Sequence, residues 1–159
     1  MFGGNMQAIS LRPEWAMPVM LGWKSIECRT WKTDYRGDLL ICSSSKPLAL
    51  TIDSHALAVV ELIDIVPFEK NHLEDAFMEE MPEKSSFAWI LDNLRWIKPF
   101  KQKGKLHLFE VDDSLIEILP DEMSNVECLR TYYEPLMNFG RNEKERLQWE
   151  EIVAEFKKE

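Results

Sequence analysis

Apolar residues recur along this chain with two different spacings. Alternation with a period of two predicts strands over residues 6–11, 26–31, 56–65, 86–91 and 106–111, and a run that is apolar on both faces predicts an internal strand over 39–43. A proline keeps a further segment, 96–100, extended. Proline in a first turn and two capping boxes predict helices over 13–21, over 71–81 and from 142 to 156. About six strands and two helices therefore precede residue 112, which suits a small closed or nearly closed β-barrel.

Residues 22–37 break this pattern with a concentration of polar and aromatic side chains. Between two glycines they hold four cations, two anions, two tryptophans and a tyrosine. In a strand over 26–31 alternate side chains share a face, so Glu27, Arg29 and Trp31 stand together, and Lys24 directly precedes them. Two interpretations fit this arrangement: a functional site, or an ion pair that stabilises an ordinary surface strand.

The net charge of −9 is unevenly distributed. Residues 1–50 carry a balance of +2, whereas residues 51–112 carry −5 and residues 113–159 carry −6. The acidity thus lies away from the polar stretch. A local cationic patch on an acidic protein is compatible with selective binding of an anionic ligand, but not with strong nonspecific attraction to long polyanions.

Two other places carry polar side chains that invite explanation. Glu61 lies in the middle of the strongest predicted strand, on an otherwise apolar face, so we expect it to be paired or functional. Lys24 and Arg29 are its nearest candidate partners in type, and both a structural ion pair and a catalytic or ligand-orienting acid fit. The loop at 43–47 holds Ser44 and Lys46 among further serines; it can bind a phosphate or carboxylate, or be an ordinary loop.

The cysteines and histidines limit the chemistry further. Three cysteines without a CxxC spacing indicate a reducing, cytoplasmic environment rather than a disulfide framework. No histidine has companions at metal-ligand spacing, so the sequence predicts no metal site and indicates no cofactor. It has no apolar run of about eighteen residues and no leader-like beginning, so we expect a soluble protein with no membrane partner.

Short motifs between residues 10 and 105 fit together as a set. They are Ser10-Leu11-Arg12-Pro13-Glu14-Trp15-Ala16, Gly22-x-Lys24-x-x-Glu27-x-Arg29-x-Trp31, Tyr35-Arg36-Gly37-x-Leu39-Leu40-Ile41, Val60-Glu61-Leu62-Ile63-Asp64, Phe87-Ala88-Trp89 and Ile97-Lys98-Pro99-Phe100 with Lys103-Gly104-Lys105. Together they resemble the ASCH domain (activating signal cointegrator homology) over residues 6–112, and the Gly-x-Lys-x-x-Glu-x-Arg motif is the most specific part.

The resemblance implies an α+β fold. We expect a small PUA-like β-barrel of about six strands with flanking helices, and a cleft between the barrel and its helices. It also implies a function on RNA or another nucleic acid, as a binder or as part of a larger regulator. Carried over to this chain, the family motif places Lys24, Glu27 and Arg29 in the cleft.

Other side chains join the candidate site on chemical grounds, because aromatic faces stack on bases and Arg, Lys and hydroxyl groups meet phosphates. The full set of candidate ligand-binding residues is Trp15, Lys24, Glu27, Arg29, Trp31, Tyr35, Arg36, Ser44 and Lys46. We expect RNA or a nucleotide-like small molecule as partner. Lys24 and Arg29 would meet phosphates or base edges, Glu27 would accept from an exocyclic amine, and Trp15 or Tyr35 would stack.

An enzymatic function is the alternative. One branch of the family is similar to small amidohydrolases that deacetylate acetylcytidine with the motif lysine, a threonine three residues later and a glutamate elsewhere. Lys24 matches that lysine, but Glu27 stands at the threonine position, and a carboxylate cannot replace a hydroxyl nucleophile without a change of chemistry. As a hydrolase of an amide or phosphodiester bond in a nucleoside or RNA, the chain would use Lys24 with Glu27 or Glu61 as catalytic residues.

The chain divides into two predicted parts. Residues 1–112 form the ASCH (PUA-like) domain, and residues 113–159 form an acidic helical extension that the resemblance does not explain. Its last helix carries Trp149, Ile152, Val153 and Phe156 on one stripe. We expect this stripe to pack on the barrel, because a tryptophan-bearing stripe is costly to leave in water. In a third reading, the stripe binds a protein partner.

Overall fold

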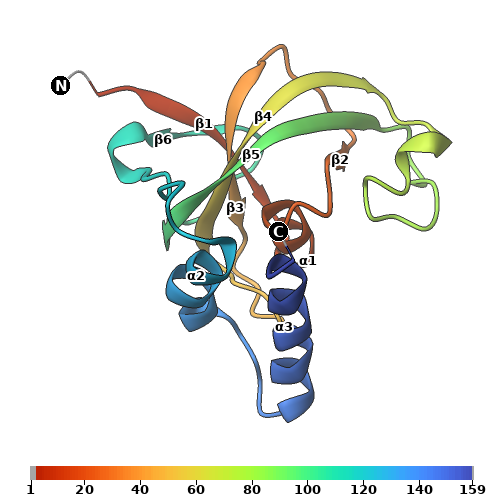
Figure 1. The fold of residues 1–159 in the computed structure, drawn as a ribbon. Helices are drawn as coiled ribbons and strands as arrows, with labels where there is room; N and C mark the ends of the chain where they lie inside the picture. Colours follow the sequence, from red (N-terminus) through yellow and green to blue (C-terminus); the bar gives the residue numbers. More distant parts are fainter. Residues whose placement is uncertain (1–2, 159) are drawn as a thin grey trace.

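A six-stranded sheet forms the centre of the computed structural model, which describes residues 3–158 (Figure 1). The strands are β1 (Asn5–Leu11), β2 (Ile26–Arg29), β3 (Gly37–Ser43), β4 (His55–Pro67), β5 (Phe87–Lys101) and β6 (Phe109–Asp112). Their order is β2-β5-β4-β3-β1-β6. β1 runs parallel to β3, and the other neighbouring strands are antiparallel. The α+β class is confirmed.

The sheet is open rather than closed into a barrel. Its two outer strands, β2 and β6, have four residues each, and within residues 3–158 they do not pair with each other. Register shifts where β4 pairs with β5 bend these two long strands, as β-bulges do. The curvature is therefore present, but the edge strands are too short to complete the closure that the sequence suggested.

Several predicted strands differ from the structure in their bounds. β2 ends at Arg29, so Trp31 lies beyond the strand instead of on its face. β3 begins at Gly37, two residues before the predicted strand over 39–43. The two predicted segments 86–91 and 96–100 are one strand, β5, which passes through Asn93 in the left-handed region (φ 50°), a conformation that asparagine tolerates.

The predicted helix over 71–81 is wrong. The segment forms one 3₁₀ turn, η1 (Lys70–His72), capped by reciprocal contacts between Glu69 and His72. Turns follow, and Phe77 adopts a positive φ of 58°, which a continuous helix does not allow. Ala76, buried against Ile26, holds this loop to the sheet.

Buried side chains cover both faces of the central strands. On one face, Ile9 of β1 and Ile41 of β3 share a core with Met20 of helix α1 (Pro13–Met20). On the other face, Ala8 and Leu40 pack with residues of β4, β5 and β6. This agrees with the prediction that the strand at 39–43 is apolar on both sides.

The segment after β6 covers one end of the sheet (Figure 1). It comprises η2 (Asp113–Leu115), α2 (Asn125–Cys128), a π-helical turn η3 (Leu129–Tyr133), η4 (Glu134–Leu136) and α3 (Glu143–Phe156). The buried hydroxyl of Tyr133 donates to the carbonyl of Leu57 at 2.7 Å. Trp149 of α3, 1% exposed, and Val153 belong to the same core as β1 and β3. These two side chains of the apolar stripe therefore face the protein interior, where no partner reaches them.

No helix within residues 3–158 is both long and apolar enough to cross a membrane. Cys28, Cys42 and Cys128 are free thiols. Burial raises the pKa of the Cys42 thiol to about 12, so this thiol stays protonated at neutral pH.

Candidate functional site

The Gly-x-Lys-x-x-Glu-x-Arg motif lies where the chain turns from α1 into β2. Gly22 has a φ of 83°, which a residue with a Cβ rarely adopts, and it follows the last turn of the helix directly. The carbonyl of Pro18 accepts the backbone N–H groups of both Trp23 and Lys24, at 2.9 and 3.1 Å. This tight reversal directs the Lys24 side chain into the protein.

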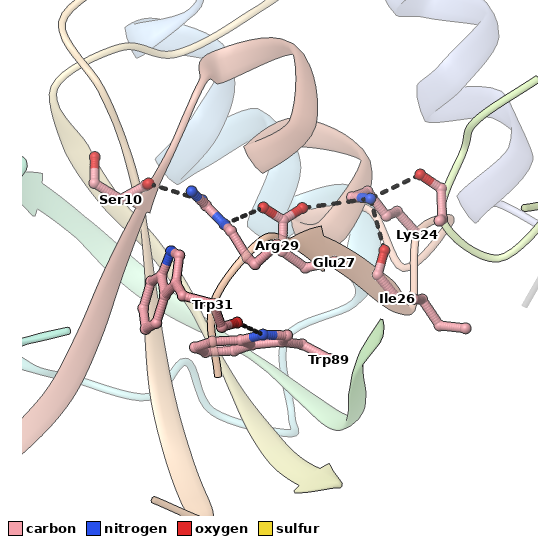
Figure 2. A network of polar contacts seen from close by, with 8 residues as sticks. Ser10, Lys24, Ile26, Glu27, Arg29, Trp31 and Trp89 are labelled. Carbon is pink, nitrogen blue, oxygen red and sulfur yellow. Dashed lines mark hydrogen bonds and ion pairs between the residues drawn. The ribbon is translucent and has the colours of Figure 1, made fainter. Parts of the chain in front are cut away.

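Lys24 is 4% exposed, and its ammonium group is fully engaged (Figure 2). Nζ donates to the carbonyls of Ile26 at 2.6 Å and Ala76 at 2.7 Å, and it lies 3.4 Å from Oε1 of Glu27. An ammonium has three donors, so these acceptors account for all of them. Burial lowers the pKa of Lys24, and the Glu27 carboxylate partly counteracts this shift.

Glu27 connects Lys24 to Arg29. It is 7% exposed, and its Oε2 lies 2.8 Å from Nε of Arg29. Nη2 of Arg29 donates to the backbone carbonyl of Ser10 on β1 at 3.2 Å. Figure 2 shows the resulting chain of contacts from Ser10 through Arg29 and Glu27 to Lys24. The other guanidinium N–H groups form no hydrogen bond within the described residues, so Arg29 keeps donors for a ligand.

These side chains form one wall of a cavity of about 350 Å³, here called the motif cavity. It is lined by Ser10, Arg12, Trp15, Lys24, Glu27, Cys28, Arg29, Ser44, Ala76 and Met78. The ring of Trp15 has its centroid 5.4 Å from Nζ of Lys24. Cations, a carboxylate, an aromatic face and hydroxyl groups therefore surround one space that is large enough for a small ligand.

Five of the predicted ligand-binding residues line the motif cavity: Trp15, Lys24, Glu27, Arg29 and Ser44. The other four lie elsewhere. The Trp31 ring meets the rings of Trp89 and His107 edge-on, each with centroids 4.8 Å apart, and the Trp31 carbonyl accepts Nε1 of Trp89. Trp31 therefore packs against Trp89 and His107 and does not line the motif cavity.

Tyr35, Arg36 and Lys46 also lie away from the motif cavity. The Tyr35 hydroxyl donates to the carbonyl of Asp38, and the Arg36 guanidinium donates to carbonyls of its own loop, including that of Tyr35. Lys46 is exposed in the serine-rich loop. The prediction placed them at the site by residue type alone, and the irregular segment 30–36 leads Tyr35 and Arg36 away from the cavity.

Glu61 does not pair with Lys24 or Arg29, so that expectation is wrong. It is half-buried on β4, where the strand registers place it opposite Asp38 of β3 and Asp92 of β5. Lys24 and Arg29 bind Glu27 instead. The reason is the sheet order, because β5 separates β4 from β2 and its motif.

The structure also brings in residues that the candidate set omitted. Ser10 and Arg12 line the cavity from the junction between β1 and α1. Both belong to the motif at residues 10–16, which could have indicated them. Ala76 and Met78 come from the loop between β4 and β5, and nothing in their local sequence marks them. Within residues 3–158, no three His, Cys, Asp or Glu side chains are arranged to hold a metal ion.

The family model of the ASCH domain matches residues 9–155. The chain belongs to the ASCH domain family. The match includes the motif cavity and continues through most of α3. No functionally curated protein matches the sequence.

Solved structures of an ASCH protein from Zymomonas mobilis, ZmASCH, share the fold. A serine-to-alanine variant superposes with a TM-score of 0.56 at 18% identity, covering 70% of this chain and 96% of that one. A tyrosine-to-phenylalanine variant gives 0.52 at 20% identity, covering 68% and 91%. The unmodified protein gives 0.53 at 18% identity, covering 67% and 87%. At this identity the likeness describes the architecture alone.

Proposed function

We propose that this ASCH-domain protein binds RNA or a nucleotide-like ligand in the motif cavity. The observation that carries the proposal is the ion network on one wall, in which Glu27 binds both Lys24 and Arg29 while the Trp15 ring lines the same cavity. A fixed guanidinium, a carboxylate and an aromatic face are the groups that recognise a phosphate, an exocyclic amine and a base. Family membership supports the same class of ligand.

The contacts suggest a division of roles. Arg29 retains N–H groups for a phosphate or a base edge, and its planar fork suits bidentate binding. Glu27 accepts from an exocyclic amine through its remaining lone pairs, and Trp15 stacks on the base. Lys24 has no donor left for a ligand, so it acts through its neighbours: it fixes the Glu27 carboxylate and ties the loop at Ala76 to the cavity.

A hydrolase of an amide or phosphodiester bond is the second candidate. One observation favours it, namely that burial lowers the pKa of Lys24 next to a carboxylate in a cavity, and shifted groups of this kind gather at catalytic sites. In that case Glu27 activates a water molecule as general base. The same contacts also describe a structural ion pair, so turnover has to be measured directly.

A titration followed by tryptophan fluorescence tests the proposal. The ligands are a short single-stranded RNA, cytidine and acetylcytidine, with acetyl release and RNA cleavage followed in the same samples. We expect wild-type protein to bind at least one of them, and Arg29→Gln to weaken that binding by about tenfold or more, the value of a charged hydrogen bond. Arg141→Gln, an exposed arginine outside the cavity, is the matched control.

The outcomes separate the candidates. Binding without product, weakened by Arg29→Gln and by Trp15→Phe but not by the control, supports a binding module. Product that disappears in Glu27→Gln while ligand affinity persists identifies a hydrolase. If wild-type protein responds to none of the three ligands, both proposals are wrong.

A further inference from the structure

A second hollow of about 770 Å³ adjoins the motif cavity, and we call it the basic hollow. It lies between the serine-rich loop after β3 and the turn after β5. It is lined by Ser10, Ser44, Ser45, Ser54, Lys101, Gln102, Lys103, Gly104, Lys105 and Leu106. Ser10 and Ser44 also line the motif cavity, so the two spaces meet at these two residues.

Three exposed lysines make the basic hollow positively charged. Lys101, Lys103 and Lys105 line it, and none of their ammonium groups forms an ion pair with a carboxylate of the described residues. The protein has 28 acidic residues and a net charge of −9, so abundant carboxylates were available to pair with them. Unpaired cations around a concave surface produce a local positive potential that attracts anions.

The turn that carries these lysines is fixed against the sheet. A Cβ on Gly104 would lie 2.3 Å from the hydroxyl of Ser10, so only glycine permits this approach. The backbone N–H of Gln102 donates to the Ser54 carbonyl at 3.0 Å, and that of Ser54 donates to the Ser44 carbonyl at 3.1 Å. Backbone hydrogen bonds and the close packing of Gly104 on Ser10 therefore fix the shape of the basic hollow.

The Ser10 hydroxyl is an unpaired polar group between the two cavities. It is buried at the junction of the two spaces and has no hydrogen-bond partner among the described residues. Buried hydroxyl groups nearly always have a partner, so the Ser10 hydroxyl leaves one hydrogen bond to be made by a water or ligand atom at this junction.

The loop between β4 and β5 beside the motif cavity has a net negative charge, with six exposed acids against Lys70 and Lys84. This loop contributes Ala76 and Met78 to the cavity lining. The acids are Glu69, Glu74, Asp75, Glu79, Glu80 and Glu83. A polyanion that enters the motif cavity is repelled by this loop and attracted by the basic hollow.

From this arrangement we infer that the basic hollow is a second, phosphate-binding subsite, and that the ligand is a single-stranded oligonucleotide rather than a free nucleoside. One nucleotide occupies the motif cavity, and the phosphates that follow it lie among Lys101, Lys103 and Lys105. Leu106, 87% exposed at the rim, offers an apolar contact to a sugar or base. The inference rests on the proposed function of the motif cavity and extends it to a longer ligand.

The test compares two ligands and two triple variants. The ligands are a fluorescein-labelled single-stranded RNA of about ten nucleotides, a typical length for one strand-binding groove, followed by anisotropy, and cytidine 5′-monophosphate, followed by tryptophan fluorescence. One variant carries Lys101→Ala, Lys103→Ala and Lys105→Ala. The control carries Lys144→Ala, Lys157→Ala and Lys158→Ala, exposed lysines of α3 and the residues after it that line neither cavity, so the two variants have equal net charge.

We expect the first variant to bind the oligonucleotide about tenfold more weakly at low salt, with a salt slope that is shallower by about 0.7 for each lost phosphate contact. Its affinity for the mononucleotide should equal that of the control. If both triple variants bind the oligonucleotide alike, or if wild-type protein binds it no more tightly than the mononucleotide, the inference is wrong while the proposed function stands. If wild-type protein binds neither ligand, both are wrong.

Discussion

Glu27 and Glu61 are strand glutamates of the same sheet, yet their surroundings differ. Glu27 on the edge strand β2 is almost fully buried, lies between two cations and forms part of a cavity wall. Glu61 on the inner strand β4 is half-buried and opposite two other carboxylates, and the nearby Arg95 binds Asp38 through two hydrogen bonds of 2.6 and 3.1 Å.

The difference shows what makes a carboxylate on a strand a candidate for function. The sequence pattern predicted that Glu61 is paired or functional, because a charge on an otherwise apolar strand face calls for a partner. In the structure Glu61 lies next to a register shift of β4 and is only half-buried, so its carboxylate is solvated by water instead of needing a buried partner. Glu27 has what Glu61 lacks: cations from the adjoining turn and from its own strand, and an open space beside them.

Removing Lys24 should have the largest effect on stability. Lys24→Met leaves Glu27 with a single cation and the carbonyls of Ile26 and Ala76 without their donor. Breaking a buried pair by removing one partner costs about 3 kcal/mol. We therefore expect the free energy of unfolding, measured in urea, to fall by about that amount. Amide hydrogen exchange should also become faster in the loop that contains Ala76.

Lys70→Met, an exposed lysine of η1 in the same loop, is the matched control and should change stability little. The combination that would contradict the supporting role of Lys24 is a loss of ligand binding with nearly unchanged stability. In that case the ammonium would contact the ligand directly.

Much of the fold could be predicted from the sequence. The strands β1, β3 and β4 and the helices α1 and α3 follow from periodicity and capping, because their local patterns agree with their packing. The helix at 71–81 failed since its capping pattern competes with the burial of Ala76 and the left-handed Phe77. The prediction of two separate segments, 86–91 and 96–100, was wrong because pairing with the long β4 carries β5 through Asn93.

The candidate site was predictable only where it is local in sequence. Lys24, Glu27 and Arg29 lie within six residues, so strand geometry and the family motif both indicate them. Trp31 was predicted on the same strand face as Glu27 and Arg29, but β2 ends at Arg29, two residues before it. Residues from other elements, such as Met78, reach the cavity through tertiary structure, which no local pattern encodes.

The Arg95–Asp38 ion pair beside Glu61 should contribute far less to the free energy of unfolding than the Lys24–Glu27 pair. Hydrogen bonds from Arg95 lower the pKa of Asp38, whose side chain is 44% exposed. A lowered carboxyl pKa adds stability above the unfolded value, near 3.8, and that stability is lost as pH falls through the folded value. Arg95→Gln should therefore cost about 0.5 kcal/mol at neutral pH, a typical value for an exposed pair.

Urea unfolding of wild type and Arg95→Gln between neutral pH and about pH 2 measures this difference. We expect its pH-dependent part to vanish at the acidic end, where Asp38 is protonated in both states of both proteins. A difference that stays constant across this range would show that the ion pair contributes nothing, and that only the contact from Nε of Arg95 to the Asn93 carbonyl matters.

Ser10→Ala should have the smallest effect on stability and still affect the ligand. The variant deletes a buried hydroxyl that has no partner among the described residues, so no hydrogen bond is lost and the free energy of unfolding should stay equal or rise slightly. If the hydroxyl meets the bound strand at the junction of the two cavities, oligonucleotide affinity should fall by roughly fivefold, the value of one neutral hydrogen bond. Unfolding in urea and anisotropy on the same preparation measure both. Unchanged affinity would remove Ser10 from the ligand path, and a clear loss of stability would assign its hydroxyl a structural role instead.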